Sequence, residues 1–202
     1  MIGPKEKRER AVGERLNLKG ERCATPKCAM VRKPYRPGVH GQQRHRRALS
    51  EFGLQLKEKQ KFKLSYGLDE RNLRQIFVKA VKAKGSSAAK MVEFLERRLD
   101  NVIFRLGFAS SRGSARQLIV HGHVSVNNRR VRSPGYAVKT GDIITTEGDI
   151  DVLKKRKEIL RKYEPPAWLH LDKEKLEGRV LSPPQNETPP FEINLVIEAF
   201  SK

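Results

Sequence analysis

The chain contains no run of apolar residues approaching the roughly 20 that a helix needs to cross a bilayer. Hydrophobic residues make up only 37% and aromatic residues 6% of its 202 residues, enough for a modest core. The first ten residues are charged and no apolar segment follows them, so we expect no secretory signal. The 2 cysteines are too few for a disulfide framework. These absences exclude a membrane partner and favour a reducing, cytoplasmic compartment.

Acidic residues are scarce relative to basic ones. The chain has 43 Lys and Arg against 23 Asp and Glu, which gives a formal net charge of +20 and a pI of about 10.3. Such an excess of one sign costs self-repulsion in the free protein. A phosphate backbone relieves that repulsion, so the composition favours a nucleic acid as partner.

The first 48 residues show no sustained apolar period and are closely punctuated by glycine and proline. Alone, such a basic segment would be poorly ordered. We expect an irregular arm that becomes ordered along RNA.

Helical patterns begin at Ser50. Apolar residues recur at helical spacing, and serine or aspartate precedes several of these stretches as a potential N-cap. Glycines mark the expected ends. The pattern predicts helices over residues 50–67, 69–84, 88–107 and 111–122.

Strand patterns follow the last of these helices. Val124 and Val126 alternate, Asn127-Asn128 favours a tight turn, and a return strand continues through Val138. Further elements are expected as a strand over 143–146, a very basic helix over 153–163, a buried Trp168-Leu169 and a final strand over 192–200. The fold class predicted is α+β.

Two domains are expected. The first, residues 1–91, is helical with an extended basic N-terminal arm, and residues 165–202 pack back on it. The second, residues 92–150, holds two helices packed on a small, mostly antiparallel sheet. Residues 151–164 form a basic helix or linker between them.

Cys23 and Cys28 form a Cys-X4-Cys pair, with His40 and His45 downstream. The spacing is within the loose range of zinc sites, but no strand-turn-helix frame surrounds it. Reduced, partly buried thiols are therefore favoured over zinc.

Four segments together resemble the S-four family of bacterial small-subunit ribosomal proteins. They are a cysteine segment, a Pro-Gly-X-His-Gly loop, a Leu-X-Glu-Lys-Gln-Lys helix and an S-four RNA-binding module, at residues 18–28, 37–41, 54–61 and 98–132. The module alone also occurs in pseudouridine synthases, tyrosyl-tRNA synthetases and stress proteins. The four segments in this order are much more specific, and the resemblance covers essentially the whole chain.

The resemblance implies a structural, non-enzymatic protein that binds 16S rRNA directly and nucleates assembly of the body of the small subunit. It implies ribosomal proteins S-five and S-three as neighbours, a share with S-five in translational accuracy, and a position where mRNA enters. It implies a cytoplasmic ribosome or that of an organelle encoding its own copy. Zinc-bearing relatives carry another cysteine pair where Glu6 and Glu9 stand here, which argues against a metal, and no cofactor is expected.

The candidate RNA-binding residues are mainly arginines, because the planar guanidinium suits phosphate oxygens and stacks on bases. The candidates for rRNA are Arg97, Arg98, Arg105, Ser110, Ser111, Arg112, Arg116, Gln117, His121, Arg8, Arg22, Lys57, Lys59 and Lys61. By resemblance, Arg44, His45, Arg46 and Arg47 border the mRNA path, although plain rRNA contact is an equal alternative. An internal pair such as Arg98 with Asp100 is the competing interpretation for the arginines.

Two other functions use the same module. A pseudouridine synthase would need a catalytic domain, for which the remaining segments are too short and irregular. A free RNA chaperone would not need the long basic arm. No Ser-His-Asp arrangement is visible, so neither a catalytic residue nor a small-molecule substrate is expected.

Overall fold

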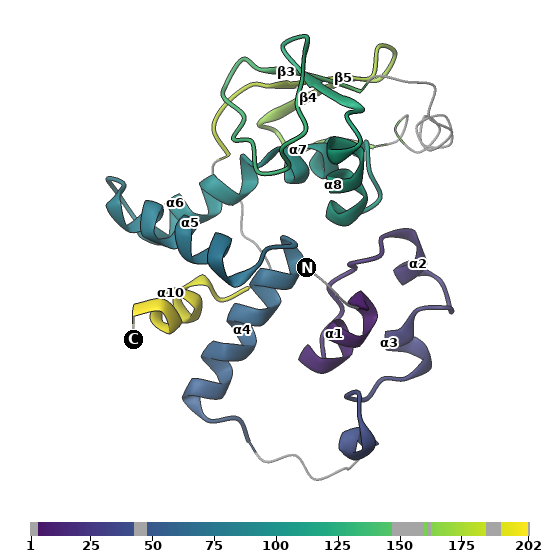
Figure 1. Cartoon of the computed structure of the whole chain (residues 1–202), viewed down its shortest axis with the longest axis vertical. Coiled ribbons are helices and arrows are strands. Elements are labelled where there is room, and N and C mark those ends of the chain that lie inside the picture. Colours follow the sequence, from purple (N-terminus) through teal and green to yellow (C-terminus); the bar gives the residue numbers. More distant parts are fainter. Residues whose placement is uncertain (1–3, 43–47, 147–159, 161–162, 185–190, 202) are drawn as a thin grey trace. The chain divides into compact units, whose positions relative to one another are not determined.

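The computed structural model describes residues 4–42, 48–146, 160, 163–184 and 191–201 (Figure 1). They divide into two compact units. The N-terminal unit comprises Met1–Met91 and Thr188–Lys202, and the sheet unit comprises Val92–Glu187. Most of the expected basic helix 153–163 lies outside the described residues. Within the described part, no helix is long and apolar enough to span a bilayer.

The N-terminal unit is helical. Its long helices are α4 (Glu51–Ser65) and α5 (Glu70–Lys82). The predicted N-caps are confirmed, because the Ser50 hydroxyl accepts from the Gly53 N–H at 3.2 Å and the Asp69 carboxylate accepts from the Asn72 N–H at 2.8 Å. Helix α6 (Ser87–Glu96) then leads from this unit into the next.

The prediction of an irregular arm before residue 48 is wrong for much of this segment. This part contains α1 (Lys5–Val12), α2 (Glu21–Ala24), α3 (Ala29–Arg32) and the 3-10 helix η1 (Val39–Gln42). Side-chain hydrogen bonds to backbone groups 7 to 25 residues away hold this part in place. The buried Glu9 accepts from the N–H groups of Leu16 and Leu18, and the Arg10 guanidinium donates to the carbonyls of Lys33 and Tyr35.

The prediction of a C-terminal strand over 192–200 is also wrong, because this segment forms helix α10 (Ile193–Ser201). Short apolar runs leave strand and helix ambiguous, and here the three-to-four-residue spacing prevails. Helix α10 packs mainly on α4, as Figure 1 shows. Val196 is fully buried, Phe200 stacks on Phe77, and Gln55 donates to Glu198 at 3.0 Å.

The sheet unit contains α7 (Leu99–Arg105), α8 (Arg112–Val120) and five antiparallel strands. The strands are β1 (Val124–Val126), β2 (Arg129–Arg130), β3 (Ile143–Thr146), β4 (Leu169–Asp172) and β5 (Glu177–Val180), in the order β2-β1-β3-β5-β4. Asn127 and Asn128 have φ of 50° and 62°, as the predicted tight turn requires. The α+β class and the antiparallel sheet are confirmed.

Residues 165–184 were expected to pack on the first domain, and the structure instead places them in the sheet unit. Strand β5 pairs with β3, with Ile143 opposite Arg179, and β4 pairs with β5. The buried Trp168 and Leu169 therefore join the core of the sheet unit. Of the C-terminal part, only residues 188–202 belong to the N-terminal unit.

The single helix expected over 88–107 is interrupted at Arg97-Arg98. Arg98 is extended, with φ −69° and ψ 137°, and bridges to Ala137. The N–H groups of Leu99 and Asp100 bond to carbonyls of the loop before β3, namely those of Tyr136 and Pro134. Loop contacts thus replace helical hydrogen bonds and separate α6 from α7. The loop itself is not the strand that was expected to run to Val138.

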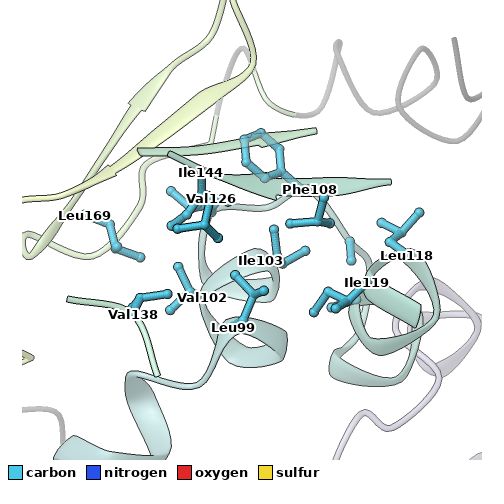
Figure 2. Close-up of a cluster of buried hydrophobic side chains, with 14 of the residues drawn as sticks. Leu99, Val102, Ile103, Phe108, Leu118, Ile119, Val126, Val138, Ile144 and Leu169 are labelled. Atoms are coloured by element: carbon cyan, nitrogen blue, oxygen red, sulfur yellow. The ribbon is translucent and has the colours of Figure 1, made fainter. Parts of the chain in front are cut away.

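The core of the sheet unit is a single apolar cluster (Figure 2). Leu99, Val102 and Ile103 from α7 meet Ile119 from α8 and Ile144 from β3, all fully buried. Helix α7 also lies close to β5, where a Cβ on Gly178 would be 2.2 Å from Leu106 Cδ1. This core sets the positions of the polar side chains around α7 and α8.

Candidate nucleic-acid interface

A buried carboxylate organises the polar face of α7. Glu96 is fully buried, and Arg105 donates to both of its oxygens, at 3.0 and 3.2 Å. The Asn101 amide donates to the same carboxylate at 2.8 Å. Two planar groups and a carboxylate therefore hold one another in fixed geometry.

Arg112, at the start of α8, is fixed to this network. Its Nε donates to Asn101 Oδ1 at 2.7 Å, and its guanidinium lies over the Phe104 ring at 4.7 Å from the centroid. A chain of hydrogen bonds thus runs from Arg105 through Glu96 and Asn101 to Arg112. The hydrogen bond to Asn101 and the cation–π contact with Phe104 together limit how far the Arg112 guanidinium can move.

Arg98 and Arg97 are held internally. Arg98 makes a two-pronged pair with Asp100, at 3.1 and 2.7 Å, and Asp100 is only 3% exposed. This is the pair that the sequence left as an alternative to RNA contact. Arg97 donates to the Val138 carbonyl and to Glu93. Both arginines brace the junction between α6, α7 and the loop before β3.

The outer side of α8 carries the exposed candidates. Arg116, Gln117 and His121 are exposed, and Ser110 is half-buried. Ser111 is the N-cap that the sequence predicts, because its hydroxyl accepts from the Ser114 N–H at 3.2 Å. A hydroxyl engaged in this way is better described as a structural cap than as an RNA contact.

The sequence reasoning omitted the cations of the hairpin from its candidates. Arg129, Arg130 and Arg132 follow the Asn127-Asn128 turn and are all exposed. A Cβ on Gly122 would lie 3.2 Å from Arg132 Nε and 3.3 Å from Arg130 Cδ, so these side chains cover the end of α8. The signal was a basic run directly after a tight turn.

In the N-terminal unit, the candidate lysines are paired with acids. Glu14 lies 2.8 Å from the Lys57 ammonium and 2.7 Å from that of Lys61. Burial would raise the pKa of Glu14, but hydrogen bonds from both lysines and their charges lower it. Burial would likewise lower the pKa of Lys61, but the hydrogen bonds that its ammonium donates to Glu14 and Glu58 raise it. These groups connect the segment after α1 to α4.

A second pairing joins α4 to α5. Lys59 and Lys63 lie 2.9 and 3.1 Å from Glu70, and Lys59 also sits over the Phe200 ring. The pKa of Glu70 is lowered: burial opposes this, and the two lysines outweigh it. Two lysines around one carboxylate leave ammonium donors available to a phosphate, since each ammonium has three.

The remaining candidates of this unit differ in setting. Arg22 donates to Glu6 at 2.8 Å, and Arg8 is half-buried beside a groove between α1 and α4. Arg44, His45, Arg46 and Arg47 lie outside the described residues.

Cys23 and Cys28 are 2% and 1% exposed and unbridged. Burial raises the pKa of the Cys23 thiol. Among the residues that the structure describes, no group of three or more potential ligands could hold a metal ion. Glu6 and Glu9 instead bond to Arg22 and to the backbone of Leu16 and Leu18.

Two family models match the chain, the Ribosomal protein S4/S9 N-terminal domain over residues 1–96 and the S4 domain over residues 97–144. The chain is also similar to curated proteins named Small ribosomal subunit protein uS4. It is 47% identical to that of Caldicellulosiruptor bescii over 210 residues, which cover 100% of this chain and 98% of the relative. The chain belongs to the uS4 family. The uS4 protein of Gloeobacter violaceus is 47% identical, with 99% and 98% covered, and that of Thermus thermophilus 45%, with 100% and 98% covered.

Membership of the uS4 family confirms the resemblance found in the sequence. The protein is a structural constituent of the small ribosomal subunit and not an enzyme. Its S4 domain is an RNA-binding domain, so the protein associates with rRNA within the ribosome. Glu96 is the last residue matched by the N-terminal model, and its partners Asn101 and Arg105, with the exposed cations of α8 and the hairpin, lie in the S4 domain.

Proposed function

We propose that this protein is a primary binder of 16S rRNA, which contacts the RNA before most other proteins and nucleates the body of the small subunit. The observation that carries the proposal is the division of arginines in the sheet unit. Arg98 and Arg105 form ion pairs with the buried carboxylates of Asp100 and Glu96. By contrast, three arginines are exposed and have no ion pair among the described residues, namely Arg116, Arg129 and Arg132. Internal pairs keep the frame rigid, and the exposed cations are then presented in fixed positions.

The finer partners are part of the same proposal. We infer neighbours S-five and S-three, a contribution with S-five to translational accuracy, and contact with mRNA where it enters, through Arg44, His45, Arg46 and Arg47. The family relationship and the net charge of +20 support these assignments. The ribosome concerned is a cytoplasmic one.

Binding of the purified protein to naked 16S rRNA, over a series of salt concentrations, tests the proposal. Reversing charge in Arg116→Glu or Arg132→Glu should weaken binding about ten-fold each and flatten the slope of log affinity against log salt by about one. Lys175→Glu, on the exposed β4–β5 turn, changes net charge equally and serves as control.

Three results would contradict parts of the proposal. Tight binding only after other ribosomal proteins are added would contradict the primary role. Unchanged slopes in both arginine variants would remove α8 and the hairpin from the interface. Recovery of the native protein free of small subunits at high salt would favour an RNA chaperone.

A further inference from the structure

A groove of about 620 Å³ lies between α1 and α4 in the N-terminal unit. Its walls are largely apolar and include Ala11 and Val12 from α1 and Leu56 and Leu64 from α4. Leu49 lines the groove as well, and Leu49 and Leu56 are 43% and 40% exposed. Large apolar side chains exposed along a concave surface are typical of a binding site.

Gly53, in the first turn of α4, forms part of the wall. Glycine is less favourable in a helix than alanine. A Cβ at this position would meet its nearest neighbour, Ser50 Oγ, at 3.4 Å, which is ordinary contact. The packing of the free chain therefore does not require glycine. A side chain here would, however, narrow the groove.

The rim of the groove is mainly cationic. Arg8, Arg36, Lys57 and Lys63 line it, against the acidic Asp69 and Glu70. Lys57 and Lys63 are held in place by Glu14 and Glu70. The occupant that this arrangement fits has an apolar, flat portion and a negative charge at its edge.

We propose that the groove holds an unstacked nucleotide of the bound rRNA, with the base against the leucines and a phosphate at the rim. This rests on the proposed function, since it specifies how the same RNA is held. Proteins read RNA mainly through bases extruded from loops and bulges, and the groove has the size and apolar lining of small-ligand sites. The rim supplies the positive charge that the phosphate requires.

Filling the groove tests the proposal. Gly53→Leu places a side chain in the groove without changing charge, Gly53→Ala adds only the Cβ that the chain accommodates, and Gln75→Leu adds an exposed leucine to α5 outside the groove. Binding to a 16S rRNA transcript and chemical probing of its bases are measured for each, and circular dichroism confirms folding.

We expect Gly53→Leu to weaken binding about ten-fold with an unchanged salt slope, because it displaces the base and leaves the cations of the rim to hold the phosphate. One base protected in the parent complex should become reactive. Gln75→Leu, outside the groove, should bind like the parent, and Gly53→Ala, which adds the smaller side chain, should lose less affinity than Gly53→Leu. If Gly53→Leu does not fold, Leu56→Ala replaces it and should expose the same base.

Parent-like affinity and an identical protection pattern in folded Gly53→Leu would overturn the proposal and leave the proposed function intact. Loss of another ribosomal protein from reconstituted subunits, with rRNA binding unchanged, would overturn it in favour of an acidic protein segment. Failure of the parent itself to bind the transcript would contradict the proposed function instead.

Discussion

Each of the two units is stabilised internally by a different kind of interaction. In the sheet unit, one continuous apolar cluster joins α7, α8 and the sheet, and the ion pairs of Arg98 and Arg105 lie beside it. In the N-terminal unit, carboxylates link separate segments of the chain. Glu14 connects to α4, Glu70 connects α5 to α4, and Glu6 connects α1 to Arg22.

This difference shows two ways of holding cations in a protein with a net charge of +20. The sheet unit has a rigid apolar scaffold and adds arginines to its surface. The N-terminal unit uses its cations as part of the scaffold, which ties its stability to charge. We therefore expect substitutions in the apolar core to lower the stability of the sheet unit most, and acid pH to lower the stability of the N-terminal unit most.

The chain carries a separate natural probe in each unit. Its 1 tryptophan is Trp168 in the sheet unit, and its 2 cysteines, Cys23 and Cys28, are both buried in the N-terminal unit. Tryptophan fluorescence therefore reports the sheet unit, and thiol reactivity reports opening of the N-terminal unit. The predictions below use both probes on the whole protein.

The largest effect is expected for Phe108→Ala. Phe108 is fully buried in the apolar cluster (Figure 2), so its removal leaves a cavity and should cost about 3–5 kcal/mol. Denaturant unfolding followed by Trp168 fluorescence measures the loss. Val120→Ala, on the exposed side of α8, should change the same transition by less than about 0.5 kcal/mol. A small effect of Phe108→Ala would show that the cluster does not dominate the sheet unit.

An intermediate effect is expected for Glu96→Gln. The substitution keeps the shape but removes the buried charge that Arg105 and Asn101 bond to, at a cost of about 2–3 kcal/mol. The matched control is Glu93→Gln, whose partner Arg97 has a 29% exposed side chain, and it should cost less than about 1 kcal/mol. Equal losses in the two variants, again by Trp168 fluorescence, would contradict a special role for Glu96.

Local signals explain which features the sequence predicted. Ser50, Asp69 and Ser111 cap helices because a hydroxyl or carboxylate satisfies nearby backbone donors, which needs only a few residues. The break at Arg97-Arg98 depends on carbonyls about 37 residues later, at Tyr136 and Pro134. The arrangement of residues 4–42 depends on Glu9 and Arg10, which bond to backbone groups 7 to 25 residues away. No local pattern contains these contacts.

The candidate RNA-binding residues divide in the same way. Composition pointed to basic side chains as candidates. The helical pattern predicts Arg112 and Arg116 on the outer face of α8, and Arg116 is exposed there, whereas Arg112 bonds to Asn101. The carboxylates of Glu96 and Asp100 determine which arginines form internal ion pairs. The burial of these carboxylates is a property of the folded unit. The hairpin arginines lie beside Gly122 only because the sheet returns the chain to the end of α8.

The smallest effect is expected in the N-terminal unit, for Glu14→Gln. The pKa of Glu14 is lower in the folded protein than its ordinary value of 4.5, so the unfolded chain binds more protons there. The contribution to stability is thus present above pH 4.5 and is lost as pH falls through the lower folded value. Because the Glu14 side chain is 41% exposed, the variant should lose only about 0.5–1 kcal/mol near neutral pH.

Reaction of Cys23 and Cys28 with a pyridyl disulfide, which works at acid pH, measures this effect as faster labelling in Glu14→Gln. The difference from the parent should shrink as pH falls from about 4.5 through the lower pKa of Glu14 in the folded protein, because protonation of Glu14 then removes the same charge in the parent. Glu192→Gln makes the same change in net charge at an exposed position and should label like the parent. A difference that does not shrink as pH falls below 4.5 would mean that the loss comes from packing or hydrogen bonding, and the contrast between a charge-linked and an apolar unit would then fail at Glu14.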